Sequence, residues 1–76
     1  MEEKISKAFD AIESASSAGK FPRPLKTQAG VFDAWECLKL LKNGGSATSV
    51  QSEVKDFFAS HGFNVIADGI GWRFSA

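Results

Sequence analysis

The feature that most constrains the fold of this chain is an Asp-Gly dipeptide between two short apolar runs near its C-terminus. Asp68-Gly69 favours a type I′ β-turn, which needs a positive φ at both central residues. A hairpin closed there pairs Ala67 with Ile70, Val65 with Trp72 and Phe63 with Phe74. Because side chains alternate along strands, all of these residues share one face. The sequence therefore predicts a C-terminal β-hairpin with an apolar face.

Length and aromatic content indicate how the rest of the chain must be used. With 76 residues, residues 1–76 are expected to form one domain, which buries only about 60% of its unfolded surface and needs an efficient core. The aromatic residues are seven Phe and two Trp, with no Tyr. Rings without hydroxyl groups suit burial, so most of them are expected in the core.

Two segments in the first half have the apolar spacing of amphipathic helices. Residues 2–18 start with acidic side chains, which suit a helix N-terminus, and are followed by Gly19, a common helix stop. Residues 31–42 carry one apolar stripe, but Phe32 and Leu40 lie outside it. This second helix is therefore apolar on more than one side and either is central to the domain or meets a partner.

A third helix is predicted over residues 48–61. Thr48 and Gln51 match a capping box at its start, and Val50 joins the apolar face that Val54, Phe57 and Phe58 continue. At its end, Gly62 suits a Schellman-type stop that brings Phe63 against Phe58.

The segment between the first two helices breaks the helical pattern. Pro22 and Pro24 favour extended backbone in the residues that precede them. Residues 25–27 are therefore expected either to form a short strand at a sheet edge or to remain part of a loop.

This order of helix, short strand, two helices and two strands resembles that of winged-helix domains, a helix-turn-helix variant that ends in a β-hairpin. The resemblance covers nearly the whole chain. It implies an α+β fold with three helices and a C-terminal hairpin, a third helix that enters the DNA major groove, and a wing tip at Asp68-Gly69. A different small α+β arrangement, with the hairpin packed across two helices, is the alternative.

Charge neither requires nor excludes DNA as a partner. The formal net charge is zero, whereas nucleic-acid binders usually carry a basic excess. Residues 14–32 and 37–52, however, contain bases and no acid. The first hypothesis is a small regulatory protein that binds duplex DNA through polar and basic side chains. The expected DNA contacts are Lys20, Arg23, Lys26, Thr48, Ser49, Gln51, Ser52, Lys55 and Arg73.

The second hypothesis is a protein-interaction module on the same fold. Its contact surface is the additional apolar side of the second helix, with Phe32, Glu36 and Leu40. The partner is then another protein or a second copy of this chain, which would make a homodimer.

No arrangement of residues predicts an enzyme, a metal site or a cofactor site. His61 and Cys37 are the only residues of their types, so they cannot complete a zinc site. We expect His61 to pack or cap the third helix, with its charge favoured by the helix dipole, and Cys37 to be a small buried residue. A single Cys favours a reducing compartment, and no apolar run approaches the ~20 residues of a membrane span. A cytoplasmic protein is expected.

Overall fold

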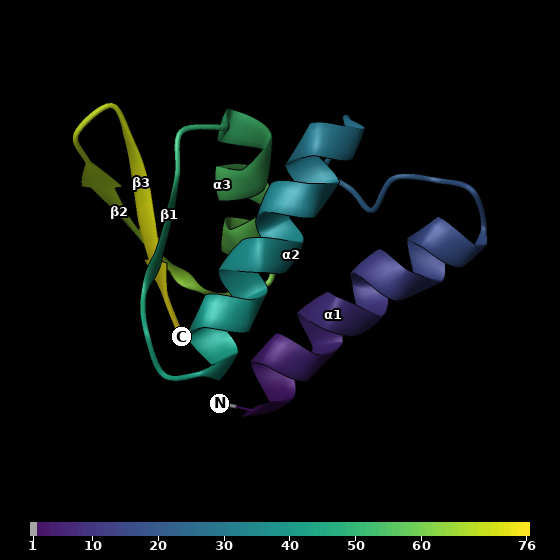
Figure 1. Ribbon diagram of the computed structural model, residues 1–76, viewed down its shortest axis with the longest axis horizontal. Coiled ribbons are helices and arrows are strands. Elements are labelled where there is room, and N and C mark those ends of the chain that lie inside the picture. The colour runs from purple at the N-terminus through teal and green to yellow at the C-terminus, as the bar shows by residue number, and fades with distance from the viewer. Residues whose placement is uncertain (1) are drawn as a thin grey trace.

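The computed structural model describes residues 2–76 and has an α+β fold, with three helices on one side of a three-stranded antiparallel sheet (Figure 1). The elements are α1 (Glu2–Ser17), α2 (Gln28–Lys42), β1 (Ala47–Ser49), α3 (Ser52–Ser60), β2 (Asn64–Asp68) and β3 (Gly71–Ser75). The strand order is β1-β3-β2, so β1 adds to the free side of the hairpin formed by β2 and β3. The predicted three helices and C-terminal hairpin are confirmed.

Each helix is followed by a glycine in the left-handed region, and the stop of α3 shows why. The Gly62 N–H donates to the Ala59 carbonyl, and the Phe63 N–H donates to the Phe58 carbonyl, both at 3.1 Å. This pair of bonds is a Schellman motif, which requires the φ of +83° that Gly62 adopts. The Phe58 and Phe63 rings meet edge to face at 5.1 Å. The stop and the ring contact predicted from the sequence are confirmed.

The segment before α2 is a loop, so the predicted alternative of a strand at residues 25–27 is wrong. Leu25 is buried in the core, and Thr27 caps α2 by accepting a hydrogen bond from the Gly30 N–H at 2.9 Å. The cap satisfies a backbone donor of the first helical turn. For this reason α2 begins at Gln28 and not at residue 31.

The strand β1 lies at residues 47–49, where the start of the third helix was predicted. Thr48 pairs with Arg73 of β3, so it cannot cap a helix, and the predicted capping box is wrong. The third helix, α3, begins at Ser52 after Gln51, whose side chain makes no capping bond. Sheet pairing thus overrides the local helix signal, and Val50 is exposed instead of lying on the apolar face of α3.

The hairpin register differs from the predicted one by two residues. The observed pairs are Asn64 with Ser75, Val65 with Phe74, Ile66 with Arg73, Ala67 with Trp72 and Asp68 with Gly71. The turn residues are therefore Gly69 and Ile70. Gly69 has a φ of +63°, and in the described chain only glycines have a positive φ, so the φ of Ile70 is negative. A positive φ at the first turn residue alone suits a type II′ turn. A shift of two keeps the side chains of Val65, Ala67, Trp72 and Phe74 on their predicted face, whereas Ile70 moves into the turn. Phe63 is unavailable to β2 because the α3 stop holds it.

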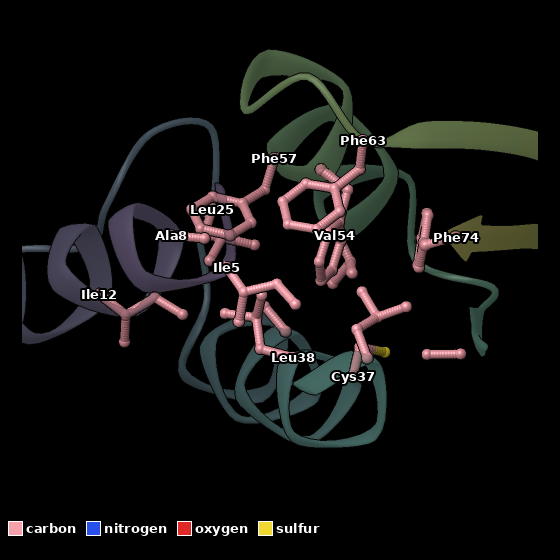
Figure 2. Packing of buried hydrophobic residues seen from close by; sticks show 14 of the residues in the cluster. Ile5, Ala8, Ile12, Leu25, Cys37, Leu38, Val54, Phe57, Phe63 and Phe74 are labelled. Atoms are coloured by element: carbon pink, nitrogen blue, oxygen red, sulfur yellow. The ribbon is translucent and has the colours of Figure 1, made fainter. Parts of the chain in front are cut away.

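One hydrophobic cluster joins all three helices to the sheet (Figure 2). Its largest fully buried side chains are Phe57, Phe58, Phe74, Leu38 and Val54. Trp72 only packs against the edge of this cluster, with the Lys55 ammonium 5.3 Å from its ring centroid. Trp72, one of the aromatic residues expected mostly in the core, is therefore only partly buried, and Phe74 holds the central place on β3.

Gly71→Ala should destabilise the fold by about 1–3 kcal/mol, the usual cost of overpacking. A Cβ at Gly71 would overlap the backbone carbonyl of Ser49 and push β1 away from β3. Urea denaturation measures the change in unfolding free energy. Gly45→Ala is the matched control, because its new Cβ would have the Leu40 carbonyl at 3.4 Å as its nearest neighbour. Equal stabilities of the two variants would contradict the close approach of β1 and β3.

Candidate interaction surfaces

The large apolar side chains left in solvent indicate where this protein can make contacts. They occur in the loop before α2, on α2 itself, and around the sheet. They are Phe21, Phe32, Leu40, Val50, Ile66 and Ile70. Single exposed apolar residues are normal on protein surfaces, whereas neighbouring ones mark contact sites.

The outer side of α2 carries the residues that the sequence predicted as a protein interface. Phe32, Glu36 and Leu40 are spaced by four residues, so they form one ridge along the helix. Phe32 is 64% exposed and Leu40 is 52% exposed, as expected from their position outside the main stripe. The Glu36 carboxylate between them binds the Lys39 ammonium at 3.0 Å. The structure therefore brings the three predicted residues together on one surface, named here the α2 ridge.

A hollow of about 550 Å³ lies beside the α2 ridge, between α1 and α2. Its apolar lining comes from Ile12 of α1 and from Val31, Phe32 and Trp35 of α2. The Trp35 ring meets the Phe9 ring edge to face at 4.8 Å. Phe32 thus belongs both to the exposed ridge and to the wall of the hollow.

A second hollow lies where α3 begins near the tip of the hairpin. Figure 1 shows the start of α3 and the β2–β3 turn at the same end of the molecule. Val50 and Gln51 line the hollow from one side, and Ile70 and Trp72 line it from the other. Of the predicted DNA contacts, Thr48 and Gln51 lie here, and Ser52 is exposed at the start of α3.

Ser49 lies in the same region, but its hydroxyl group is used within the protein. Ser49 is buried, its Oγ donates to Asp33 Oδ2 at 2.6 Å, and it accepts from the Gln51 N–H at 3.0 Å. The Gln51 side-chain amide also donates to Asp33 Oδ2, at 3.3 Å. These bonds hold the bend between β1 and α3 against α2.

Two of the predicted basic contacts are paired with acids. Lys55 Nζ lies 2.9 Å from Asp56 Oδ1, and Arg73 Nη2 lies 2.8 Å from Asp68 Oδ2. Arg73 projects from the sheet face opposite to buried Phe74, because neighbouring strand residues alternate. Exposed pairs of this kind add little stability, yet they cancel the positive charge that a phosphate would meet.

The remaining bases are spread over the molecule. Lys20, Arg23 and Lys26 are exposed in the loop between α1 and α2. Lys39 and Lys42 lie in the last turn of α2. Gly30, at the other end of α2, lies beside Glu53 at the start of α3. At a rise of 1.5 Å per residue, Lys39 and Lys42 are about 14–18 Å along the helix from Gly30. The Lys26 backbone lies next to the start of α3, because its N–H donates to Glu53. Lys39 and Lys42 therefore do not join Lys26 and Lys55 near the start of α3.

Glu53 makes a structural connection that the sequence did not indicate. Its carboxylate accepts hydrogen bonds from the backbone N–H groups of Lys26 and Thr27 and from the Thr27 hydroxyl group, the last at 2.8 Å. Gly30 lacks a Cβ that would overlap this carboxylate. Glu53 thus connects the first turn of α3 to the cap of α2. No nearby residue in the sequence signals this, because its partners lie 26 and 27 positions away.

The Cys37 and His61 side chains have structural surroundings. Cys37 is buried, its thiol contacts the Thr48 carbonyl at 3.6 Å, and burial raises its pKa to about 12, which keeps it protonated. His61 is the C-cap residue of α3 and its ring lies 4.5 Å from the Phe57 ring centroid. Burial lowers the pKa of His61, so the expected stabilisation of its charge by the helix dipole does not dominate.

Within residues 3–76, whose side chains the structure describes, no three His, Cys, Asp or Glu side chains gather as they would around a metal ion. None of the helices described for this chain has both the length and the apolar content needed to cross a bilayer. Comparisons with protein-family models, curated proteins and solved structures gave no match to this chain.

Glu53→Gln should reduce the stability of the protein at neutral pH and flatten its dependence on acid. Hydrogen bonds from Lys26, outweighing desolvation, hold the pKa of Glu53 below its ordinary value of 4.5. The unfolded chain therefore binds this proton first, and the stabilisation, complete above pH 4.5, is lost as pH falls through the folded-state pKa. Unfolding free energies measured from neutral to acidic pH test this. Equal acid profiles for the wild type and Glu53→Gln would contradict it, and Asp56→Asn is the control on the same helix.

Proposed function

We propose that this protein is an interaction module that binds another protein through the α2 ridge. The observation that carries the proposal is the position of Phe32, which is 64% exposed and also lines the hollow between α1 and α2. An exposed aromatic ring beside a hollow offers a partner both an anchor and a pocket, the combination found at protein interfaces.

The chemistry of the ridge suits an amphipathic helical segment. Leu40 lies two turns from Phe32, the spacing at which a docked helix presents its own apolar residues. Glu36 and Lys39 neutralise each other at 3.0 Å, so apolar burial on the ridge does not leave an isolated charge. A place in the reducing cytoplasm is part of this proposal, because the single cysteine of the chain is free and cannot form a disulfide within it.

Replacing Phe32 and Leu40 together by Lys should abolish partner binding without unfolding the protein, because both side chains are exposed. The purified protein is used to capture partners from an extract of its own cells, and the captured proteins are compared between variants. The control replaces Val50 and Ile70 by Lys, which adds the same charge at exposed apolar positions elsewhere. Capture that both double variants retain, or both lose, would argue against the α2 ridge.

DNA binding on a winged-helix-like fold is the second candidate. It is favoured by the direct passage of α3 into a hairpin whose tip lies at the end where α3 begins (Figure 1). The element order departs from the expected one, because the strand outside the hairpin, β1, precedes α3, whereas it was expected before α2. This candidate is the weaker one for two reasons. Lys55 and Arg73 are ion-paired with acids, and Lys39 and Lys42 lie far from the start of α3, in the last turn of α2.

If α3 contacts DNA, Lys55→Glu should weaken binding to duplex DNA and reduce the slope of log affinity against log salt by about 1. Loss of a phosphate contact releases one fewer condensed cation, which is the physical reason. Fluorescence anisotropy titrations at several salt concentrations measure both effects. Lys39→Glu, at the far end of α2, is the control. No binding of wild-type protein at low salt would remove DNA as the partner.

A further inference from the structure

The strand β2 forms an open edge of the sheet. It pairs with β3 on one side, and no other described strand lies on its second side. Figure 1 shows β2 at the outer margin of the sheet. The opposite edge is different, because β1 has only three residues and lies against α2, where the Cys37 thiol contacts the Thr48 carbonyl.

The hairpin turn decides which backbone groups face the open edge. Residues that flank a two-residue turn form a hydrogen-bonded pair, and such pairs alternate along an antiparallel ladder. Asp68, Ile66 and Asn64 therefore direct their N–H and C=O groups toward β3. Val65 and Ala67 direct theirs outward, away from β3.

This edge lacks the features that usually prevent strands from pairing. Natural edge strands carry Lys, Pro, a bulge or an inward-pointing charge. β2 contains neither Lys nor Pro. It has no bulge, because its register with β3 is unbroken over all five residues. Its one charged residue, Asp68, points away from the core and is neutralised by Arg73 at 2.8 Å.

We propose that β2 pairs antiparallel with β2 of a second copy of this chain, across a two-fold axis at Ile66. In this register Val65 of one copy meets Ala67 of the other, so the outward N–H and C=O groups of both strands become paired. Ile66 meets Ile66 of the second copy on the outer face of the sheet, where side chains of a non-hydrogen-bonded pair approach most closely.

The side chains of β2 support a second copy as the occupant. Ile66 is 60% exposed at the centre of the strand, so pairing buries two identical apolar side chains at the axis. Asn64 lies opposite Asp68 of the second copy, which sets an amide donor against a carboxylate and avoids like charges. In the single chain the Asn64 amide donates only to the Ala76 carbonyl, at 3.3 Å, among the bonds described. The strand is thus complementary to itself.

The arrangement would join two sheets into one continuous sheet of six strands. Because the contact is small, a weak dimer with a dissociation constant in the micromolar range or above is expected. The surface is separate from the α2 ridge, so the inference does not rest on the proposed function.

Sedimentation equilibrium of the full chain over a wide concentration range tests the proposal. Wild-type protein should form a dimer, and Ile66→Lys should raise the dissociation constant at least about tenfold, because it sets like charges opposite each other. Ala67→Pro should do the same, since it removes an outward N–H while leaving the bonds to β3 in place. The matched control is Val50→Lys, which changes a residue that is 62% exposed near the other edge of the sheet.

Amide hydrogen exchange tests the pairing directly and does not depend on a variant that folds. In wild-type protein, the Val65 and Ala67 amides should exchange freely at low concentration and become protected as the dimer forms. A chain that stays monomeric at millimolar concentration would overturn the proposal, as would a dimer without this protection. A dimer lost in Phe32→Lys and retained in Ala67→Pro would also overturn it, placing self-association on the α2 ridge. Retention of the dimer in Phe32→Lys with loss of captured partners would support both proposals separately.

Discussion

The packing of one aromatic ring, Phe58, connects the helical half of this protein to its sheet. The fully buried ring stacks on Phe74 of β3 with a centroid distance of 4.4 Å. It also meets Phe57 and Phe63 edge to face. The backbone of Phe58 takes part as well, since its carbonyl accepts the N–H of Phe63 and so ends α3. One residue therefore sets where α3 stops, where the hairpin begins and which strand residue reaches the core.

The distribution of charge explains why a neutral chain can still have specific surfaces. Four of the bases in the described chain lie in ion pairs with acids, at Lys7, Lys39, Lys55 and Arg73. Glu53 is used differently, because backbone donors bind its carboxylate and hold α3 against the cap of α2. With much of the charge balanced locally, the remaining distinctive surface features are the apolar α2 ridge and the open backbone edge of β2. Both suit protein partners better than phosphate groups.

These two surfaces use different physical interactions. The α2 ridge offers side chains beside a hollow, so its selectivity would come from shape and apolar burial. The edge of β2 offers main-chain donors and acceptors, so its selectivity would come from register and from the side chains that become neighbours. Because the two surfaces lie on separate elements, a protein dimerised through β2 would carry two α2 ridges. Two linked contacts would raise the apparent affinity for a partner that also has two sites.

The sequence by itself determined that there are three helices, the glycine stops of the first and the third, and the faces of the hairpin strands. Helical spacing and the conformations of Gly19, Gly44 and Gly62 are local properties, expressed within a few residues. The exposure of Phe32 and Leu40 followed from the same spacing, because both lie outside the main apolar stripe of α2.

Only the tertiary structure decided the strand at residues 47–49, the hairpin register and the position of Glu53. Each depends on partners distant in the chain. The strand depends on the pairing of Thr48 with Arg73, the register on the stacking of Phe74 on Phe58, and Glu53 on its bond with Thr27. The energies of such contacts do not appear in a local pattern, and pairing with β3 outweighed the helix signal at Thr48. Sequence spacing shows which face a residue takes, whereas long-range packing decides which residue it meets.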